Sequence, residues 1–167
     1  VLIMKKLLVL AAAVVAGAAA VFAGSLNDAF RAVSALPGMK VAENADSVDV
    51  AGPEFLDSLE VAYVNGLDGP QIRNVGNRLY DIIETLPMGE MVVGANNGLV
   101  AGFVYAEEIE GGGYEVLIVK ATGEWGNVSA VYGLTDKATV DMMRQARVVM
   151  EGAKLRIEMR RELILFN

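Results

Sequence analysis

The side chains that most often carry enzyme chemistry are missing from this chain. It contains neither histidine nor cysteine, so it lacks the usual general base, the thiol nucleophile and the common ligands of zinc, copper and haem. Serine triads and histidine metal sites are therefore excluded. Carboxylates, lysines, tyrosines and hydroxyl groups remain for chemistry. We expect a non-enzymatic protein with no catalytic residues, no metal site and no cofactor.

The remaining acidic groups give two alternatives to that expectation. Glu107, Glu108 and Glu110 form the densest acidic cluster, and paired carboxylates hydrolyse glycosides when they face each other across a cleft. They precede three consecutive glycines, however, which favours a solvated hairpin end. Asp46, Asp49 and Asp57 lack the alternating spacing of a calcium loop, so ordinary loop acids are the better interpretation.

The glycines at positions 94, 98 and 102 do not predict a nucleotide site. No helix is expected after them, and no lysine follows the last glycine, so neither dinucleotide nor triphosphate fingerprints are met. Turn and strand positions account for these glycines.

Trp125 is the candidate contact residue. It is the only tryptophan, in a turn flanked by Gly123 and Gly126, where an indole can project toward a protein or glycan partner. The alternative is that it folds back over the end of the sheet, since tryptophans are highly buried on average. Tyr105, Tyr114 and Tyr132 on neighbouring predicted strands could extend a binding surface or simply pack.

Methionines suggest a further alternative function, the transport of a small apolar ligand between sheet and helices. Methionine is flexible and lines adaptable pockets, although the same residues also fill irregular cores. The candidate lining residues are Met88, Met91, Met142, Met143 and Met150.

The first 23 residues resemble a cleavable signal peptide in their order of segments. Lys5 and Lys6 precede the apolar run 7–17, and small residues lead to Ala23, after which we expect cleavage. No lipoprotein cysteine is available, and the run is short and rich in alanine for a membrane anchor. We therefore expect residues 24–167 to be exported to the periplasm or cell surface of a Gram-negative bacterium, without stable membrane insertion.

Charge and length limit the partners of this mature part. Cleavage removes two lysines and no acidic residue, which changes the formal net charge from −7 to −9. Such a chain repels phosphate backbones, so nucleic acid is not an expected partner. Residues 24–167 fit one domain that can bury a core without disulfides or metal.

The elements that must position these residues are predicted from periodicity. Apolar residues recur at helical spacing in 25–36, 68–87 and 136–152. Strands are expected at 59–64 and 153–160, with about four more between residues 90 and 135, where short apolar runs alternate with turn residues. A further short strand is possible at 48–50. Together they predict an α+β fold, an antiparallel meander of four to six strands with helices mainly on one face.

Three stretches, 35–39, 115–120 and 128–136, occur in an order that resembles small exported domains of unknown function common in Bacteroidetes. The resemblance covers the layout of most of the mature chain and is made of apolar and turn residues. It implies an exported location and this architecture, and no chemistry. The chain departs from it at Lys154 and beyond.

Overall fold

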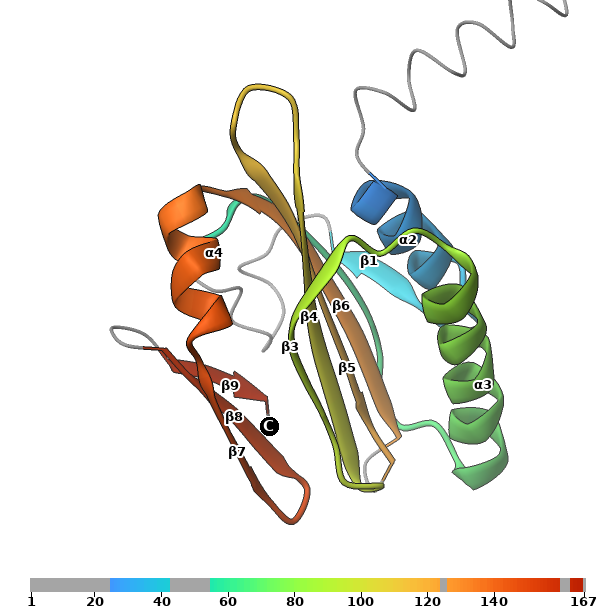
Figure 1. The fold of residues 1–167 in the computed structure, drawn as a ribbon. Helices are drawn as coiled ribbons and strands as arrows, with labels where there is room; N and C mark the ends of the chain where they lie inside the picture. The colour runs from blue at the N-terminus through green and yellow to red at the C-terminus, as the bar shows by residue number, and fades with distance from the viewer. Residues whose placement is uncertain (1–24, 43–54, 124–125, 160–162, 167) are drawn as a thin grey trace, which may run out of the picture.

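The computed structural model describes residues 25–42, 55–123, 126–159 and 163–166. These residues form an α+β fold with two antiparallel sheets, one of six strands and one of three. Figure 1 shows two helices on one side of the large sheet, and a third helix with the small sheet on the other side.

The large sheet follows the predicted meander. Strands β3 to β6 are consecutive hairpins, and β6 then pairs with β2. The order across the sheet is β1 (Lys40–Ala42), β2 (Asp57–Val64), β6 (Asn127–Thr135), β5 (Tyr114–Thr122), β4 (Val100–Glu108) and β3 (Glu90–Asn96). The strands predicted at 59–64 and within 90–135 are confirmed. The predicted strand at 48–50 lies outside the described residues.

Helix α3 (Gly69–Thr85) carries the chain from β2 to the opposite edge strand β3. Its start is fixed by a reciprocal cap: the Gln71 N–H donates to Asp68 Oδ1 at 2.8 Å, and the Asp68 N–H donates to Gln71 Oε1 at 3.0 Å. Pro70 occupies the first turn, where its missing N–H costs no hydrogen bond. This confirms the helix predicted at 68–87.

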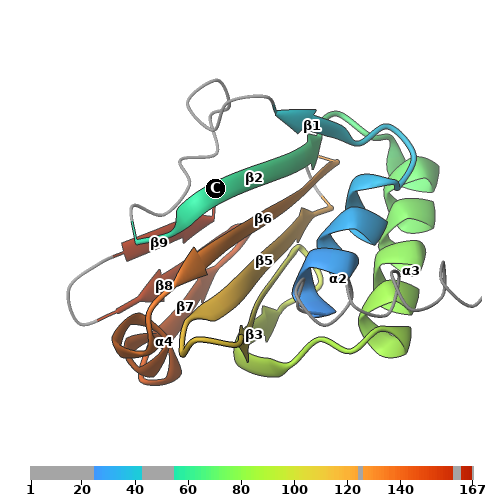
Figure 2. The same cartoon turned by 90° about the horizontal axis from the view of Figure 1, so that it is seen from above.

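Helix α2 (Ser25–Ser34) lies beside α3 on the same face of the sheet (Figure 2). Four of its side chains are fully buried, and the three larger ones each contribute about 1.5–3 kcal/mol by removal from water. They are Leu26, Ala29, Phe30 and Val33. We call the cluster that they form with Leu117, Val119 and the inner residues of α3 the helix-side core.

The other face of the large sheet is covered by α4 (Lys137–Arg144) and the small sheet of β7 (Arg147–Glu151), β8 (Lys154–Glu158) and β9 (Leu163–Phe166). Leu155 and Ile157 of β8 pack with Met143 of α4 against Val104 and Ile118 of the large sheet. We call this cluster the second-layer core. Both faces are covered, which explains why β4 and β5 are apolar on both sides.

The prediction of a helix at 136–152 is wrong for the second half of that range. Asp136 caps α4 as expected, accepting from the Thr139 N–H at 2.7 Å, but the helix ends at Arg144 and residues 147–151 form β7. Val148 and Val149 are β-branched and favour a strand. Gly152 has φ 57° and is the first residue of the two-residue turn 152–153. Glycine is favoured at this position in the tight turn of a hairpin, here between β7 and β8.

The strand predicted at 153–160 is confirmed as β8, and it belongs to the small sheet. Among the described residues, no helix has both the length and the apolar character needed to span a membrane.

Candidate functional site

Connecting segments gather at one end of the large sheet, where β2, β3 and β5 end and β4 and β6 begin. We call this the loop end. It comprises residues 65–68, residues 97–99, the turn glycines 123 and 126, and residues 152–153 of the small sheet. In Figure 1 these turns lie at the bottom of the molecule, at the start of α3.

Hydrogen bonds join the four segments directly. The Gly123 N–H donates to the Leu99 carbonyl at 2.9 Å, and the Leu67 N–H donates to the Gly126 carbonyl at 3.0 Å. The side-chain amide of Asn97 donates to the Gly152 carbonyl at 2.7 Å. The loop end is therefore a connected surface that spans both sheets.

The β3–β4 turn is held in shape by its own asparagines. Asn96 Oδ1 accepts from the Gly98 N–H at 2.9 Å, and Asn97 Oδ1 accepts from the N–H groups of Leu99 and Val100 at 3.0 Å each. Such side-chain bonds to nearby backbone stabilise a turn. The turn presents Leu99, an apolar side chain that is 48% exposed.

Gly126 is the tightest point of the loop end. Its φ is 61°, and a Cβ added there would overlap the backbone of Leu67. Only glycine allows this backbone approach. Gly126 therefore packs directly on the backbone of the β2–α3 loop.

Trp125, the predicted contact residue, lies outside the described residues. The flanking residues Gly123 and Gly126 both belong to the loop end. A binding role for Trp125 stays a prediction.

The three tyrosines do not extend a surface around this turn. Tyr105, Tyr114 and Tyr132 are only 5%, 7% and 8% exposed. Tyr105 and Tyr132 pack in the helix-side core, whereas Tyr114 packs in the second-layer core at the far end of β5. Of the two alternatives in the sequence, the structure shows packing.

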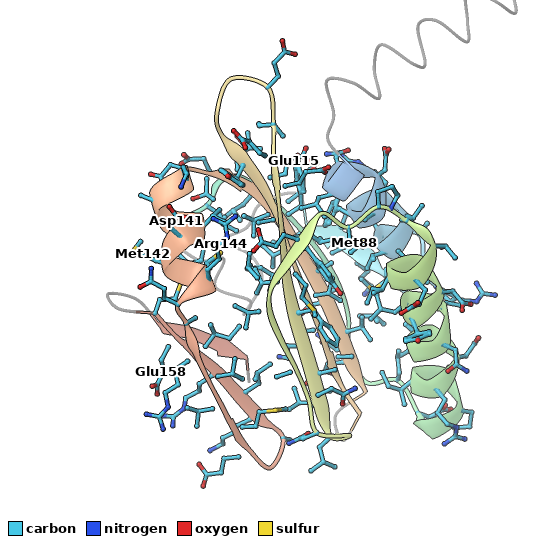
Figure 3. The ribbon with its side chains drawn as sticks, in the orientation of Figure 1. Met88, Glu115, Asp141, Met142, Arg144 and Glu158 are labelled. Carbon is cyan, nitrogen blue, oxygen red and sulfur yellow. The ribbon has the colours of Figure 1, made fainter. Side chains whose placement is uncertain are left out.

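The methionines proposed to line one apolar cavity are separated by the sheet. Met88 belongs to the helix-side core, and Met143 and Met150 pack in the second-layer core. Met91 is 55% exposed, and Met142 is partly exposed. Figure 3 shows Met88 and Met142 on opposite sides of the molecule. They do not face a common space.

The acidic cluster lies at the opposite end from the loop end. Glu108 and Glu110 are exposed at the β4–β5 hairpin, as the sequence predicts for a solvated end. Glu107 stands opposite Glu115 in the register of β4 and β5, but Glu115 is only 3% exposed and accepts a hydrogen bond from the Tyr132 hydroxyl. A polysaccharide has no access to this pair.

The described residues contain no group of three or more acidic side chains arranged to hold a metal ion. Two of the three calcium candidates, Asp46 and Asp49, lie outside those residues, and Asp57 is exposed. The absence of a metal site therefore stays a prediction.

Arg144 makes an ion-pair network that sequence reasoning missed. Its guanidinium donates to both carboxylate oxygens of Glu90, the shorter contact being 2.7 Å, and also bonds Asp141. The hydrogen bond from Arg144 lowers the pKa of Glu90. Figure 3 shows Arg144 pointing from α4 toward the sheet. The network fastens α4 to the edge strand β3, so we assign it a structural role.

No family model, curated protein or solved structure matches this chain significantly.

Proposed function

We propose that the chain is an exported, non-enzymatic binding domain that recognises a protein or glycan partner through the loop end. The observation that carries the proposal is the joining of four segments from both sheets by hydrogen bonds between their turns. A pre-ordered surface loses little conformational entropy when it binds, which favours affinity.

The chemistry of the loop end supports recognition without catalysis. The β2–α3 loop presents the exposed Asn65, and the β3–β4 turn presents the exposed side chain of Leu99. Amides with an apolar or aromatic anchor suit glycan hydroxyl groups and protein backbones. The sequence adds Trp125, whose indole would supply the anchor.

The alternatives have less support from the packing. A carrier of a small apolar ligand needs a shared cavity, and the candidate methionines are divided between two cores. A carboxylate-dependent hydrolase needs two acids that face each other across a cleft, and Glu108 and Glu110 are instead exposed at the β4–β5 hairpin. The export signal and acidic charge favour action in the periplasm or at the cell surface, away from nucleic acid.

The proposal is tested with residues 24–167, using bacterial cell-wall glycans and the periplasmic proteins of the host as probes. Trp125→Ala and Leu99→Ser should each weaken binding at least about tenfold, the usual range for a central anchor. The matched control is Tyr80→Ser: Tyr80 is 60% exposed, and it lies eleven residues into α3, about 17 Å along the helix from the loop end. Equal binding by all variants, or greater loss in the control, contradicts the proposal.

A further inference from the structure

Strand β3 is the longest edge strand among the described residues. It has seven residues and pairs with β4 alone, whereas the other edge strands, β1, β7 and β9, have three, five and four residues. Figure 2 shows β3 at the edge of the large sheet opposite β1. Short edge strands protect a sheet against pairing with another chain, and a longer edge with unpaired backbone groups can accept one. β3 is therefore the edge at which a further strand can be added.

The register of the β3–β4 hairpin shows which backbone groups of β3 point outward. The Asn97 N–H donates to the Val100 carbonyl at 3.2 Å and closes the turn. In an antiparallel pair, residues that exchange hydrogen bonds alternate with residues that do not. Ala95 therefore bonds β4, whereas the N–H and carbonyl groups of Gly94 and Asn96 point away from it. Both of these residues are exposed.

Gly94 leaves the helix-side face of this edge open to an approaching chain. It stands opposite Phe103, which packs against the helix-side core and is only partly buried. Met91 lies against the same position, and its side chain is 55% exposed. A glycine inside a strand often marks a place where another backbone approaches closely. A strand added here covers Met91 and Phe103, which gives it an apolar contact besides its backbone hydrogen bonds.

The charge near this edge indicates the kind of partner. Asp81 and Glu84 lie near the end of α3, the helix that leads into β3, and both are exposed. Burial, and then the negative charge of Glu84, raise the pKa of Tyr105, the residue opposite Met91 in the register. An acidic surface attracts a basic partner. A second copy of this chain brings the same acidic residues and a formal net charge of −7, so it fits this edge less well.

We propose that the outer edge of β3 binds an extended, basic segment of a partner protein, which joins the six-stranded sheet as a further strand. Gly94 and Asn96 exchange backbone hydrogen bonds with the segment, and its alternate apolar side chains lie on Met91 and Phe103. Strand addition of this kind takes affinity from the main chain and specificity from alternate side chains. The inference goes beyond the proposed function, because it uses neither the loop end nor the export signal.

Gly94→Pro and Gly94→Ala are a matched pair of variants for testing this edge. Both add a Cβ near the flexible side chain of Met91, but only proline removes the outward N–H. Proline is tolerated on an edge strand where the N–H faces solvent, so we expect both variants to fold with similar melting temperatures. The probe is a phage-displayed library of short random peptides, selected on residues 24–167, which contain every described element.

We expect the selected peptides to be rich in lysine, arginine and β-branched residues, and to bind Gly94→Ala as they bind the wild type. Binding to Gly94→Pro should fall about fivefold, the effect of losing one hydrogen bond. Equal binding to both variants overturns the proposal, and so does selection of acidic peptides. Peptides that are lost only in Leu99→Ser belong to the loop end and also overturn it. A wild-type dimer in sedimentation that Gly94→Pro dissociates shows that a second copy fills the edge, against the basic partner.

Hydrogen exchange tests the same contact in the wild-type chain, without any variant. The amides of Gly94 and Asn96 should exchange rapidly in the free protein and slow down when a selected peptide binds. The Ala95 amide, already bonded to β4, should exchange slowly in both states. Peptide binding that protects other amides and leaves Gly94 and Asn96 unchanged contradicts strand addition at β3.

Discussion

A substitution at Gly102 tests whether the small sheet packs on the large sheet as described. It lies on β4 beneath Leu155 of β8, and a Cβ at position 102 would come closer to Leu155 Cδ2 than two carbon atoms can lie. Leu155 is fully buried, so its side chain cannot turn into solvent. Gly102→Ala should therefore overpack the second-layer core, at about 1–3 kcal/mol, partly offset by about 0.5–1 kcal/mol because alanine is less flexible than glycine in a strand.

The assay is thermal and urea unfolding of residues 24–167. A net loss of about 1–2 kcal/mol should lower the melting temperature by about 2–8 °C in a domain of this size. Gly94→Ala is the matched control. Its Cβ would lie 2.8 Å from the sulfur of Met91, which is 55% exposed and free to move away, so this change should cost much less.

A double variant isolates the contact. Leu155→Ala alone should cost about 2–5 kcal/mol, but in that background Gly102→Ala should cost nothing, which gives a coupling energy of about 1 kcal/mol or more. If Gly102→Ala costs no more than the Gly94 control, or if the two changes are simply additive, β8 is not packed on β4 as described.

Three further predictions concern single residues. Gly126→Ala should destabilise the chain by more than Gly98→Ala, because the new Cβ overlaps the backbone of Leu67 whereas position 98 is open; both glycines have positive φ, and urea unfolding compares them. Ser58 has φ 54°, which costs a non-glycine residue about 1–2 kcal/mol, so Ser58→Gly should raise the melting temperature; a fall contradicts this. Burial, and then the hydrogen bond to Glu115, raise the pKa of Tyr132 to about 12. The stability that the chain gains from the protonated Tyr132 hydroxyl should therefore be fully present below pH 10 and be lost between about pH 10 and 12. Ultraviolet titration should show a tyrosine that ionises near pH 12 and is missing from Tyr132→Phe; titration of all tyrosines near 10 would refute this.

Local patterns in the sequence were sufficient for strands β2 to β6 of the large sheet and for the two helices that cover it, whereas the short edge strand β1 was not predicted. The cap at Asp68, the apolar spacing of α3 and the glycine turns of the meander each depend on residues close in the chain. Those short-range preferences agree with the final fold, which is why the boundaries were recoverable.

The layer formed by α4 and the small sheet could not be predicted from the same patterns. Val140, Met143 and Met150 share a helical spacing, yet Met150 is in β7, because pairing with β8 decides the conformation of residues 147–151. A tertiary partner outweighs local periodicity here.

The candidate site was predictable only in part. The turn of Trp125 was recognisable from its glycines, but its contacts with Leu67 and Leu99 join residues far apart in sequence.

The most direct test of the loop end as a recognition surface is native mass spectrometry of residues 24–167 isolated from the host. We expect a defined complex with a protein or glycan that is retained in Tyr80→Ser and lost in Leu99→Ser and Trp125→Ala. A co-purifying small apolar molecule that is unaffected by these loop-end changes would contradict the account and support a carrier.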